Sequence, residues 1–250
     1  MNIGLYQSAS TLSALERWQD CVSQNITSAQ TSGFRKRTVE FSTESAGRWN
    51  IDPKARAGST GNEVDALFTH VTNGINFLTG ETQPTRRELD VAIQGDGFFE
   101  VKQPDGTKAY TRNGELRVRP DRTLVTTGGL EIMTEGDSPI TLLPSGGPIT
   151  INRDGTIFQG DIALGKLSIQ KFARPEALIP IAGGMFLPTA GAGIEQVEEP
   201  ELMQGYLEQS NVQALREMVD LVLISRAYEA NQKVISSVDQ QMQKTLDALG

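Results

Sequence analysis

Residues 211–249, NVQALREMVDLVLISRAYEANQKVISSVDQQMQKTLDAL, contain neither glycine nor proline and predict one long helix at the carboxyl end of the chain. We expect Ser210 to cap this helix, with Gln213 completing the S-x-x-Q form of the capping box. Apolar and small side chains recur along it at spacings of three and four residues, which is typical of a helix with one packed face. At ~1.5 Å per residue such a helix is on the order of 60 Å long. One small domain cannot cover that length, so we expect part of the helix to pack elsewhere.

The amino-terminal segment, residues 1–34, predicts a second helix with a weaker pattern. Its heptad positions a and d are occupied by Leu5, Ser8, Leu12, Leu15, Gln19, Val22, Ile26 and Ala29. Burial of the larger side chains stabilises this helix only against a partner. That partner is either a neighbouring subunit, in a coiled coil, or the carboxyl-terminal helix of the same chain, in a two-helix hairpin, and the pattern favours neither. We expect Gly33 to end the helix in the left-handed conformation at C′, with Phe34 packing back.

The middle of the chain has a different pattern. Residues 35–87 are polar, contain glycine and proline and show no sustained period, so we interpret them as an extended connector. From residue 88 to residue 204, turn signals separate short alternating segments, which predicts antiparallel β structure. The Asn113-Gly114 pair is the strongest hairpin signal, because a type I′ turn needs positive φ at both central residues. The predicted fold class is therefore α+β, with long, coiled-coil-like helices in residues 1–34 and 205–250 flanking a mainly antiparallel β domain.

Composition excludes several classes of protein. The 250 residues carry a formal net charge of −8 with a pI near 4.8, so we expect no nucleic acid or anionic membrane surface as partner, since both require a basic face. A single histidine, His70, and a single cysteine, Cys21, cannot build a zinc site of the usual kind or a disulfide within the chain. No apolar run approaches the ~20 residues of a membrane-spanning helix. Residues 1–25 lack the regions of a Sec signal peptide, so none is expected.

No pattern indicates an enzyme. The Gly95-Asp96-Gly97 stretch has no helix after it and no third glycine, so we expect a β-turn there and not a phosphate-binding loop. The aspartates of the middle segment lie where turns favour aspartate, which leaves a glycosidase-like carboxylate pair without support. We expect His70 and the basic cluster Arg35-Lys36-Arg37 to be solvated, and Cys21 to be a semi-buried helical thiol. We predict no catalytic, cofactor-binding or metal-binding residues, no cofactor and no small-molecule substrate.

Three separated stretches carry recognisable motifs. Residues 23–34, SQNITSAQTSGF, match the pattern S-x-N-L-A-N-x-x-T-x-G-[FY] except at the Leu-Ala pair and the second asparagine. Residues 89–99, LDVAIQGDGFF, are followed by 110–114, YTRNG. Residues 205–212, GYLEQSNV, precede a helix that carries Arg226, Ala227, Tyr228, Glu229, Lys233 and Ile235. Together these stretches span nearly the whole chain, which resembles the bacterial flagellar basal-body rod and hook family.

The resemblance implies a structural axial protein whose termini pair as coiled-coil helices in an inner tube, with the β domain outside it. The implied partners are other copies of the chain, neighbouring rod and hook axial proteins, and the flagellar type III export apparatus, which needs no cleaved signal peptide. The implied location is the bacterial flagellum basal body, in the rod that spans the periplasm. Residues 42–87 look short for the distal rod subunit, which favours a proximal rod protein.

Apolar residues of the two helices are candidates for the contact between subunits, because a heterologous contact that does not close produces a helical tube. The predicted subunit-interface residues are Leu5, Leu12, Leu15, Val22, Ile26, Leu215, Met218, Val222, Tyr228, Ile235 and Met242. The alternative function is a secreted β-rich binding module that dimerises through its helices. An aromatic-lined groove would favour that alternative, although Phe98, Phe99 and Tyr110 look like alternating core residues.

Overall fold

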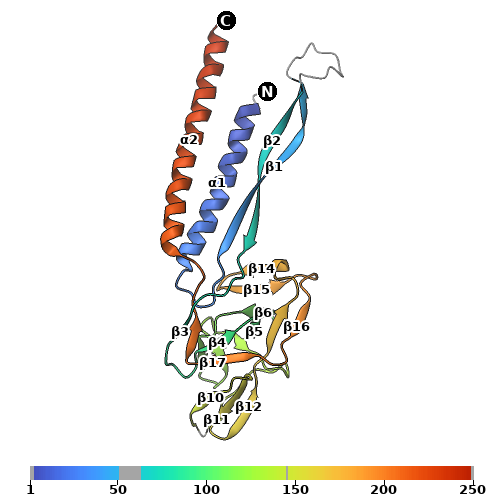
Figure 1. Cartoon of the computed structure of the whole chain (residues 1–250), viewed down its shortest axis with the longest axis vertical. Helices are drawn as coiled ribbons and strands as arrows, with labels where there is room; N and C mark the ends of the chain where they lie inside the picture. Colours follow the sequence, from blue (N-terminus) through green and yellow to red (C-terminus); the bar gives the residue numbers. More distant parts are fainter. Residues whose placement is uncertain (1–2, 51–62, 145, 249–250) are drawn as a thin grey trace. The chain divides into compact units, whose positions relative to one another are not determined.

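The computed structural model describes residues 3–50, 63–144 and 146–248, and the chain is α+β, as predicted (Figure 1). Helices α1 (Ile3–Thr27) and α2 (Ala214–Asp247) lie at the two ends of the sequence, and the strands lie between them. The described residues form two compact units. We call them the helical unit, residues 3–26, 37–50, 63–74 and 213–248, and the β unit, residues 27–36, 75–144 and 146–212. Among these residues no helix combines the length and apolar character needed to cross a membrane.

Helix α2 begins later than predicted. The backbone N–H groups of Arg216 and Glu217 donate to the carbonyl of Gln213, at 2.9 and 3.1 Å, so the first helical turn is closed on Gln213. Ser210 instead accepts a hydrogen bond on Oγ from the N–H of Val212 at 3.2 Å. The predicted capping box at Ser210 is therefore wrong, because that side chain stabilises a turn that precedes the helix.

The helical unit contains paired strands where we expected only a connector. Strands β1 (Arg37–Asn50) and β2 (Glu63–Ile75) form a two-stranded sheet. Trp18 of α1 meets Phe41 of β1 edge to face, with ring centroids 5.5 Å apart, and Gln7 Nε2 donates to the carbonyl of Leu67 at 3.1 Å. Side chains 40–45 are all exposed. Because neither face of this stretch is buried, its alternate positions need not be apolar. The alternation that normally indicates a strand is therefore absent from the sequence.

The β unit consists of short strands that pair antiparallel throughout its described residues, as predicted, although strands remote in sequence are often neighbours in its sheets. Its largest sheet has nine strands in the order β14-β15-β6-β5-β9-β8-β7, with β13 and β16 joined through β5. A three-stranded sheet, β10-β11-β12, and the pairs β17-β4 and β18-β3 complete it. The bounds are β3 (Thr82–Pro84), β4 (Val91–Gln94), β5 (Phe98–Lys102), β6 (Lys108–Thr111), β7 (Leu116–Val118), β8 (Leu124–Thr126), β9 (Glu131–Ile132), β10 (Ile149–Ile151), β11 (Thr156–Gln159), β12 (Ile162–Lys166), β13 (Ile169–Phe172), η1 (Pro175–Ala177), β14 (Leu178–Ile181), β15 (Met185–Pro188), β16 (Ile194–Gln196), β17 (Glu201–Gln204) and β18 (Tyr206–Glu208).

Two hydrophobic clusters stabilise the β unit. The larger one is built on fully buried residues such as Phe99, Leu116 and Ile157. The second is aromatic: Phe98, Tyr110, Phe172 and Phe186 are buried together, with Phe77 packed against them. Phe98, Phe99 and Tyr110, which the sequence suggested as core residues, are thus core residues. Burial of each large side chain contributes about 1.5–3 kcal/mol to the stability of this unit.

Asn113-Gly114 does not form the predicted hairpin. Strand β6 pairs with β5 and β15, whereas β7 pairs with β8, and neither Asn113 nor Gly114 has positive φ. Asn113 Oδ1 instead accepts a hydrogen bond from the N–H of Glu115 at 2.9 Å, which forms an Asx turn. A Cβ atom on Gly114 would lie 1.7 Å from the carbonyl oxygen of Val91. Glycine is required here for close backbone approach and not for a left-handed conformation.

Candidate functional site

Helices α1 and α2 pack against each other within one chain. Leu15 and Val22 of α1 are buried with Ile224 of α2, and the partly buried residues around them are Trp18, Ile26, Leu221 and Tyr228. Asn231 Nδ2 of α2 donates to the carbonyl of Ser8 at 3.2 Å, while the far end of α1 meets the first turn of α2. The helices are therefore antiparallel. Of the two arrangements left open by the sequence, the two-helix hairpin accounts for this packed face.

A buried polar contact joins the other ends of the two helices. Asn25 Nδ2 donates to Glu217 Oε2 and to the carbonyl of Arg37, both at 2.9 Å, and Asn25 Oδ1 accepts from the N–H of Arg37 at 2.9 Å. Asn25 is fully buried and Glu217 nearly so. One side chain thus connects α1, α2 and the start of β1. Asn25 lies in the SQN stretch of residues 23–25, and this motif was the feature of the sequence that pointed to a role for it.

The structure divides the predicted interface residues into three groups. Leu15 and Val22 are buried inside their own chain, against α2. Five more are half-buried in the described chain, namely Leu5, Leu12, Ile26, Tyr228 and Ile235. The remaining four are exposed, namely Leu215, Met218, Val222 and Met242.

Exposed apolar side chains gather on the first turns of α2. We call Leu215, Met218, Val219, Val222 and Leu223 the base patch; these side chains are 50–79% exposed. At 3.6 residues per turn they share one side of the helix. The opposite side carries Ile224, which is fully buried against α1. Monomeric soluble proteins rarely expose so continuous an apolar face, which makes the base patch a candidate interaction surface.

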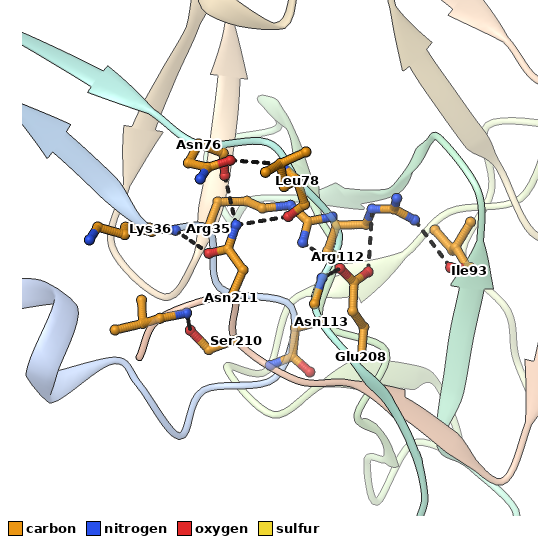
Figure 2. Close-up of polar contacts among 12 residues, drawn as sticks. Arg35, Lys36, Asn76, Leu78, Ile93, Arg112, Asn113, Glu208, Ser210 and Asn211 are labelled. Carbon is orange, nitrogen blue, oxygen red and sulfur yellow. Dashed lines mark hydrogen bonds and ion pairs between the residues drawn. The ribbon is translucent and has the colours of Figure 1, made fainter. Parts of the chain in front are cut away.

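Within the β unit, Glu208 at the end of β18 lies at the centre of a buried polar cluster (Figure 2). We call Arg35, Arg112, Glu208 and Asn211 the junction cluster. Glu208 Oε1 accepts from the guanidinium of Arg35 and from the N–H of Gly80, the latter at 2.8 Å, and Arg112 Nε lies 3.6 Å from Glu208 Oε2. All three charged side chains are at most 3% exposed. Opposite charges and a backbone donor stabilise the buried carboxylate.

Arg112 extends the cluster into the β unit. Its guanidinium donates to the carbonyls of Ile93 and Gly95 and lies over the ring of Phe98, 5.5 Å from the centroid. Burial lowers the pKa of Arg112 to about 10, against the opposing effect of the Glu208 carboxylate. Arg112 therefore remains protonated at neutral pH, and the ion pair with Glu208 is intact there.

Asn211 provides the other half of the junction cluster, on the stretch that leads towards α2 (Figure 2). Its Oδ1 accepts from the N–H of Lys36 at 2.6 Å, and its Nδ2 donates to the carbonyls of Asn76 and Leu78 at 2.9 and 2.8 Å. Residues 33–36, 76–80 and 208–211 are thus held side by side. Glu208 lies in the motif of residues 205–212 and Arg35 directly follows the motif of residues 23–34, but neither residue was predicted to contribute to a site.

Gly33 fits its place only because it lacks a side chain. Its φ is +69°, the left-handed conformation that we predicted, and its N–H donates to the carbonyl of Glu208 at 2.7 Å. A Cβ atom would lie 2.4 Å from the carbonyl carbon of Arg112. The predicted C′ position is wrong, because α1 already ends at Thr27. Phe34 is buried, as expected for a side chain that packs back.

The other residues that the sequence analysis singled out are His70, Cys21 and the basic cluster of residues 35–37. One of them, Arg35, differs from the expectation. His70 is exposed and Cys21 is buried in α1. No group of three or more metal-ligating side chains occurs among the described residues. The exception is Arg35, which we expected to be solvated with Lys36 and Arg37 but which is 2% exposed. The basic run of residues 35–37 gave no sign of burial, because the partner of Arg35 is the carboxylate of Glu208, which is remote in sequence.

Comparisons with known proteins identify the family. Two family models match, "Flagellar hook protein FlgE/F/G D1 domain" over residues 92–159 and "Flagellar basal body rod FlgEFG protein C-terminal" over residues 203–248. The chain is 33% identical to the flagellar basal-body rod protein FlgG of Borreliella burgdorferi, over 94% of each chain. It is 32% identical to FlgF of Caulobacter vibrioides, over 100% of this chain and 99% of the relative. The chain therefore belongs to the flagellar basal-body rod protein family, whose members are structural proteins and not enzymes.

Proposed function

We propose that this chain is a subunit of the flagellar rod that polymerises through its terminal helices. The base patch is the observation that carries the proposal, because it leaves a continuous apolar face of α2 without a partner in the described chain. If each of its side chains contributes about 1.5 kcal/mol on burial, the patch offers enough free energy to hold neighbouring subunits together. The relatives named as basal-body rod proteins cover nearly the full chain, which supports the same role.

The proposal assigns different tasks to the two units. Helices α1 and α2 form the inner tube and make coiled-coil contacts with the helices of neighbouring subunits. The β unit lies outside the tube, and its junction cluster holds the two stretches of chain that lead to the helices. Leu15, Val22 and Ile224 stabilise the helix pair within each subunit. The base patch is then available for contacts between subunits.

The proposal also assigns a place and a route. The chain is located in the basal body, in the rod that spans the periplasm, and contacts other copies of itself and neighbouring axial proteins. It is exported by the flagellar type III apparatus. A proximal position in the rod is favoured, because residues 42–87 are short for a distal rod subunit.

Purified basal bodies test this function. We expect mass spectrometry to detect the wild-type chain in hook–basal-body complexes isolated from its own bacterium. Val222→Glu, which places a charge in the base patch, should be exported but depleted at least about tenfold from the complexes, a change that corresponds to 1.4 kcal/mol. Gln240→Glu adds the same charge at another exposed site on α2 and should be incorporated normally. Absence of the wild-type chain from the complexes would contradict the proposal.

A further inference from the structure

The Asn113-Gly114 pair combines a chemically labile sequence with a closed place in the fold. In an Asn-Gly pair the backbone nitrogen of the glycine can attack the side-chain amide of the asparagine, because glycine has no side chain that obstructs the approach. The side-chain nitrogen then leaves as ammonia. Asn113 is half-buried and Gly114 is buried in the β unit. Whether this reaction occurs therefore depends on how firmly the fold holds the two residues.

The backbone of Gly114 is fixed by the neighbouring chain. The N–H of Val91 donates to the carbonyl of Gly114 at 3.0 Å, and a Cβ atom on Gly114 would lie 1.7 Å from the carbonyl oxygen of Val91. The N–H of Leu116 donates to the carbonyl of Leu89 at 3.3 Å, so the pairing continues past the glycine. The Gly114 nitrogen therefore cannot swing towards the asparagine side chain unless this backbone separates from Val91.

Asn113 is held by contacts of its own. Its Oδ1 accepts a hydrogen bond from the N–H of Glu115 at 2.9 Å, and its N–H donates to Thr111 Oγ1 at 3.1 Å. A Cβ atom on Gly33 would lie 2.6 Å from the Asn113 nitrogen, so the backbone at residue 33 packs directly on this peptide. Closure of a ring between the Asn113 side chain and the next nitrogen requires rotation of the Asn113 backbone. These contacts oppose that rotation.

We infer that Asn113-Gly114 is a modification site that reacts only while the β unit is open. The Gly114 nitrogen forms a bond with Asn113 Cγ, the Cγ–Nδ2 bond breaks, and ammonia leaves with the proton that the Gly114 nitrogen gives up. The product is a cyclic imide. Water opens this imide at Cγ, which yields aspartate, or at the backbone carbonyl, which yields isoaspartate. Water is the co-reactant, and nothing is oxidised or reduced.

The two products differ in whether the fold accepts them. Aspartate leaves the main chain unchanged and keeps an oxygen that can accept from the N–H of Glu115. Isoaspartate adds one carbon to the main chain between Asn113 and Gly114, beside the close contacts with Gly33 and Val91. A chain with isoaspartate at position 113 therefore cannot rebuild the β unit. The site thus turns prolonged opening of this unit into an irreversible loss.

Peptide mapping by mass spectrometry tests the protection in the full chain, aged in mildly alkaline buffer with and without guanidinium chloride. Asn73-Gly74 is the second Asn-Gly pair of the sequence, so its rate in denaturant calibrates the unprotected reaction. Both pairs should deamidate at similar rates in denaturant, and Asn113 should react at least about tenfold more slowly in buffer. A smaller difference would overturn the inference. So would a slow reaction at Asn113 in denaturant while Asn73 reacts, because the local sequence and not the fold would then protect it.

Refolding tests the fate of the two products. Chains aged in denaturant are returned to buffer, and the refolded fraction is isolated by size-exclusion chromatography and mapped. Aspartate at position 113 should occur in this fraction, whereas isoaspartate should be confined to chains that do not refold. Asn113→Asp is the matched control, which should fold and release no ammonia at this position. Isoaspartate at position 113 in the refolded fraction, or an Asn113→Asp chain that fails to fold, would overturn the assignment. These measurements are independent of assembly, so their failure leaves the proposed rod function unaffected.

Discussion

The carboxylate of Glu208 and the guanidinium of Arg35 form a buried ion pair between residues 173 positions apart in the chain. Both side chains are at most 2% exposed. Because Arg35 follows α1 and Glu208 precedes α2 in the sequence, the pair fixes both stretches to the same β unit. Buried pairs of this kind are sensitive to the loss of one partner, which leaves a desolvated charge uncompensated.

Glu208→Gln should therefore destabilise the β unit by about 3–5 kcal/mol, since Arg35 and Arg112 lose their buried carboxylate. Glu201→Gln is the matched control, because Glu201 pairs with Arg153 at 2.9 Å while both side chains remain at least half exposed. The control should change stability by no more than about 1 kcal/mol. Urea unfolding followed by hydrogen exchange at β-unit amides measures both effects. Equal losses for the two variants would contradict a special role of the junction cluster.

Gly33→Ala tests the close approach between residue 33 and the backbone of Arg112. Gly106 provides the control, because it also has positive φ, at +86°, but an added Cβ would meet nothing within 4 Å. Gly106→Ala should cost only the left-handed strain of about 1–2 kcal/mol. Gly33→Ala should cost clearly more, because its Cβ would lie 2.4 Å from the Arg112 carbonyl carbon. Calorimetric unfolding should show a larger drop in melting temperature for Gly33→Ala than for Gly106→Ala. Equal drops would mean that the backbone around Arg112 moves away from the added Cβ at little energetic cost.

Asn25→Ala tests the polar contact between the helices. The change removes donors to Glu217 and to the carbonyl of Arg37 from a fully buried place, which should destabilise the helical unit by about 1–3 kcal/mol. Gln19→Ala alters an exposed residue of the same helix and should be nearly neutral. Trp18 of α1 packs against Phe41 of β1, so its fluorescence reports unfolding of the helical unit in urea. Unchanged midpoints for Asn25→Ala would show that the contact contributes nothing to stability.

The turn aspartates predict acid sensitivity of the β unit. A hydrogen bond from the backbone of Thr107 lowers the pKa of Asp105, and those of Thr123 and Thr156 do the same for Asp121 and Asp154. A carboxylate whose folded pKa lies below its ordinary value of 3.8 stabilises the fold fully above that value, and this contribution is lost as the pH falls through the folded pKa. Stability should therefore decline below about pH 4.

Carboxyl carbon NMR titration of the folded chain checks these pKa values directly. Asp105→Asn keeps an oxygen that can accept from Thr107 but removes the titrating charge, so the acid-induced loss of stability should become smaller in this variant. An Asp105 signal that titrates at or above 3.8 would refute the assignment.

The sequence predicted the α+β class and antiparallel strands within residues 88–204, because their signals are local. Segments such as Val91–Gln94 and Phe98–Lys102 combine buried apolar residues with adjoining turn residues, and the structure has strands there. The β1-β2 sheet escaped prediction because its side chains 40–45 are exposed and carry no alternating pattern. Asn113-Gly114 was misread, because close packing on Val91 demands a glycine as strongly as a type I′ turn does.

The junction cluster escaped prediction for a different reason. Arg35 lies in a basic run that, by itself, is typical of a solvated helix end. Its partner Glu208 is remote in sequence, and only the finished fold places the two side chains together. Heptad reasoning had the same limit in the helices. It identified apolar positions, but it did not separate Leu15, which packs inside the chain, from Leu215, which is exposed.

Sedimentation velocity of the wild-type chain over a wide range of concentrations, with electron microscopy of the largest species, tests whether the chain polymerises. We expect assembly that grows with concentration into open-ended filaments or stacked rings, because a heterologous contact that does not close extends into an open-ended assembly. A monomer at every concentration, or a dimer that never grows, would contradict it.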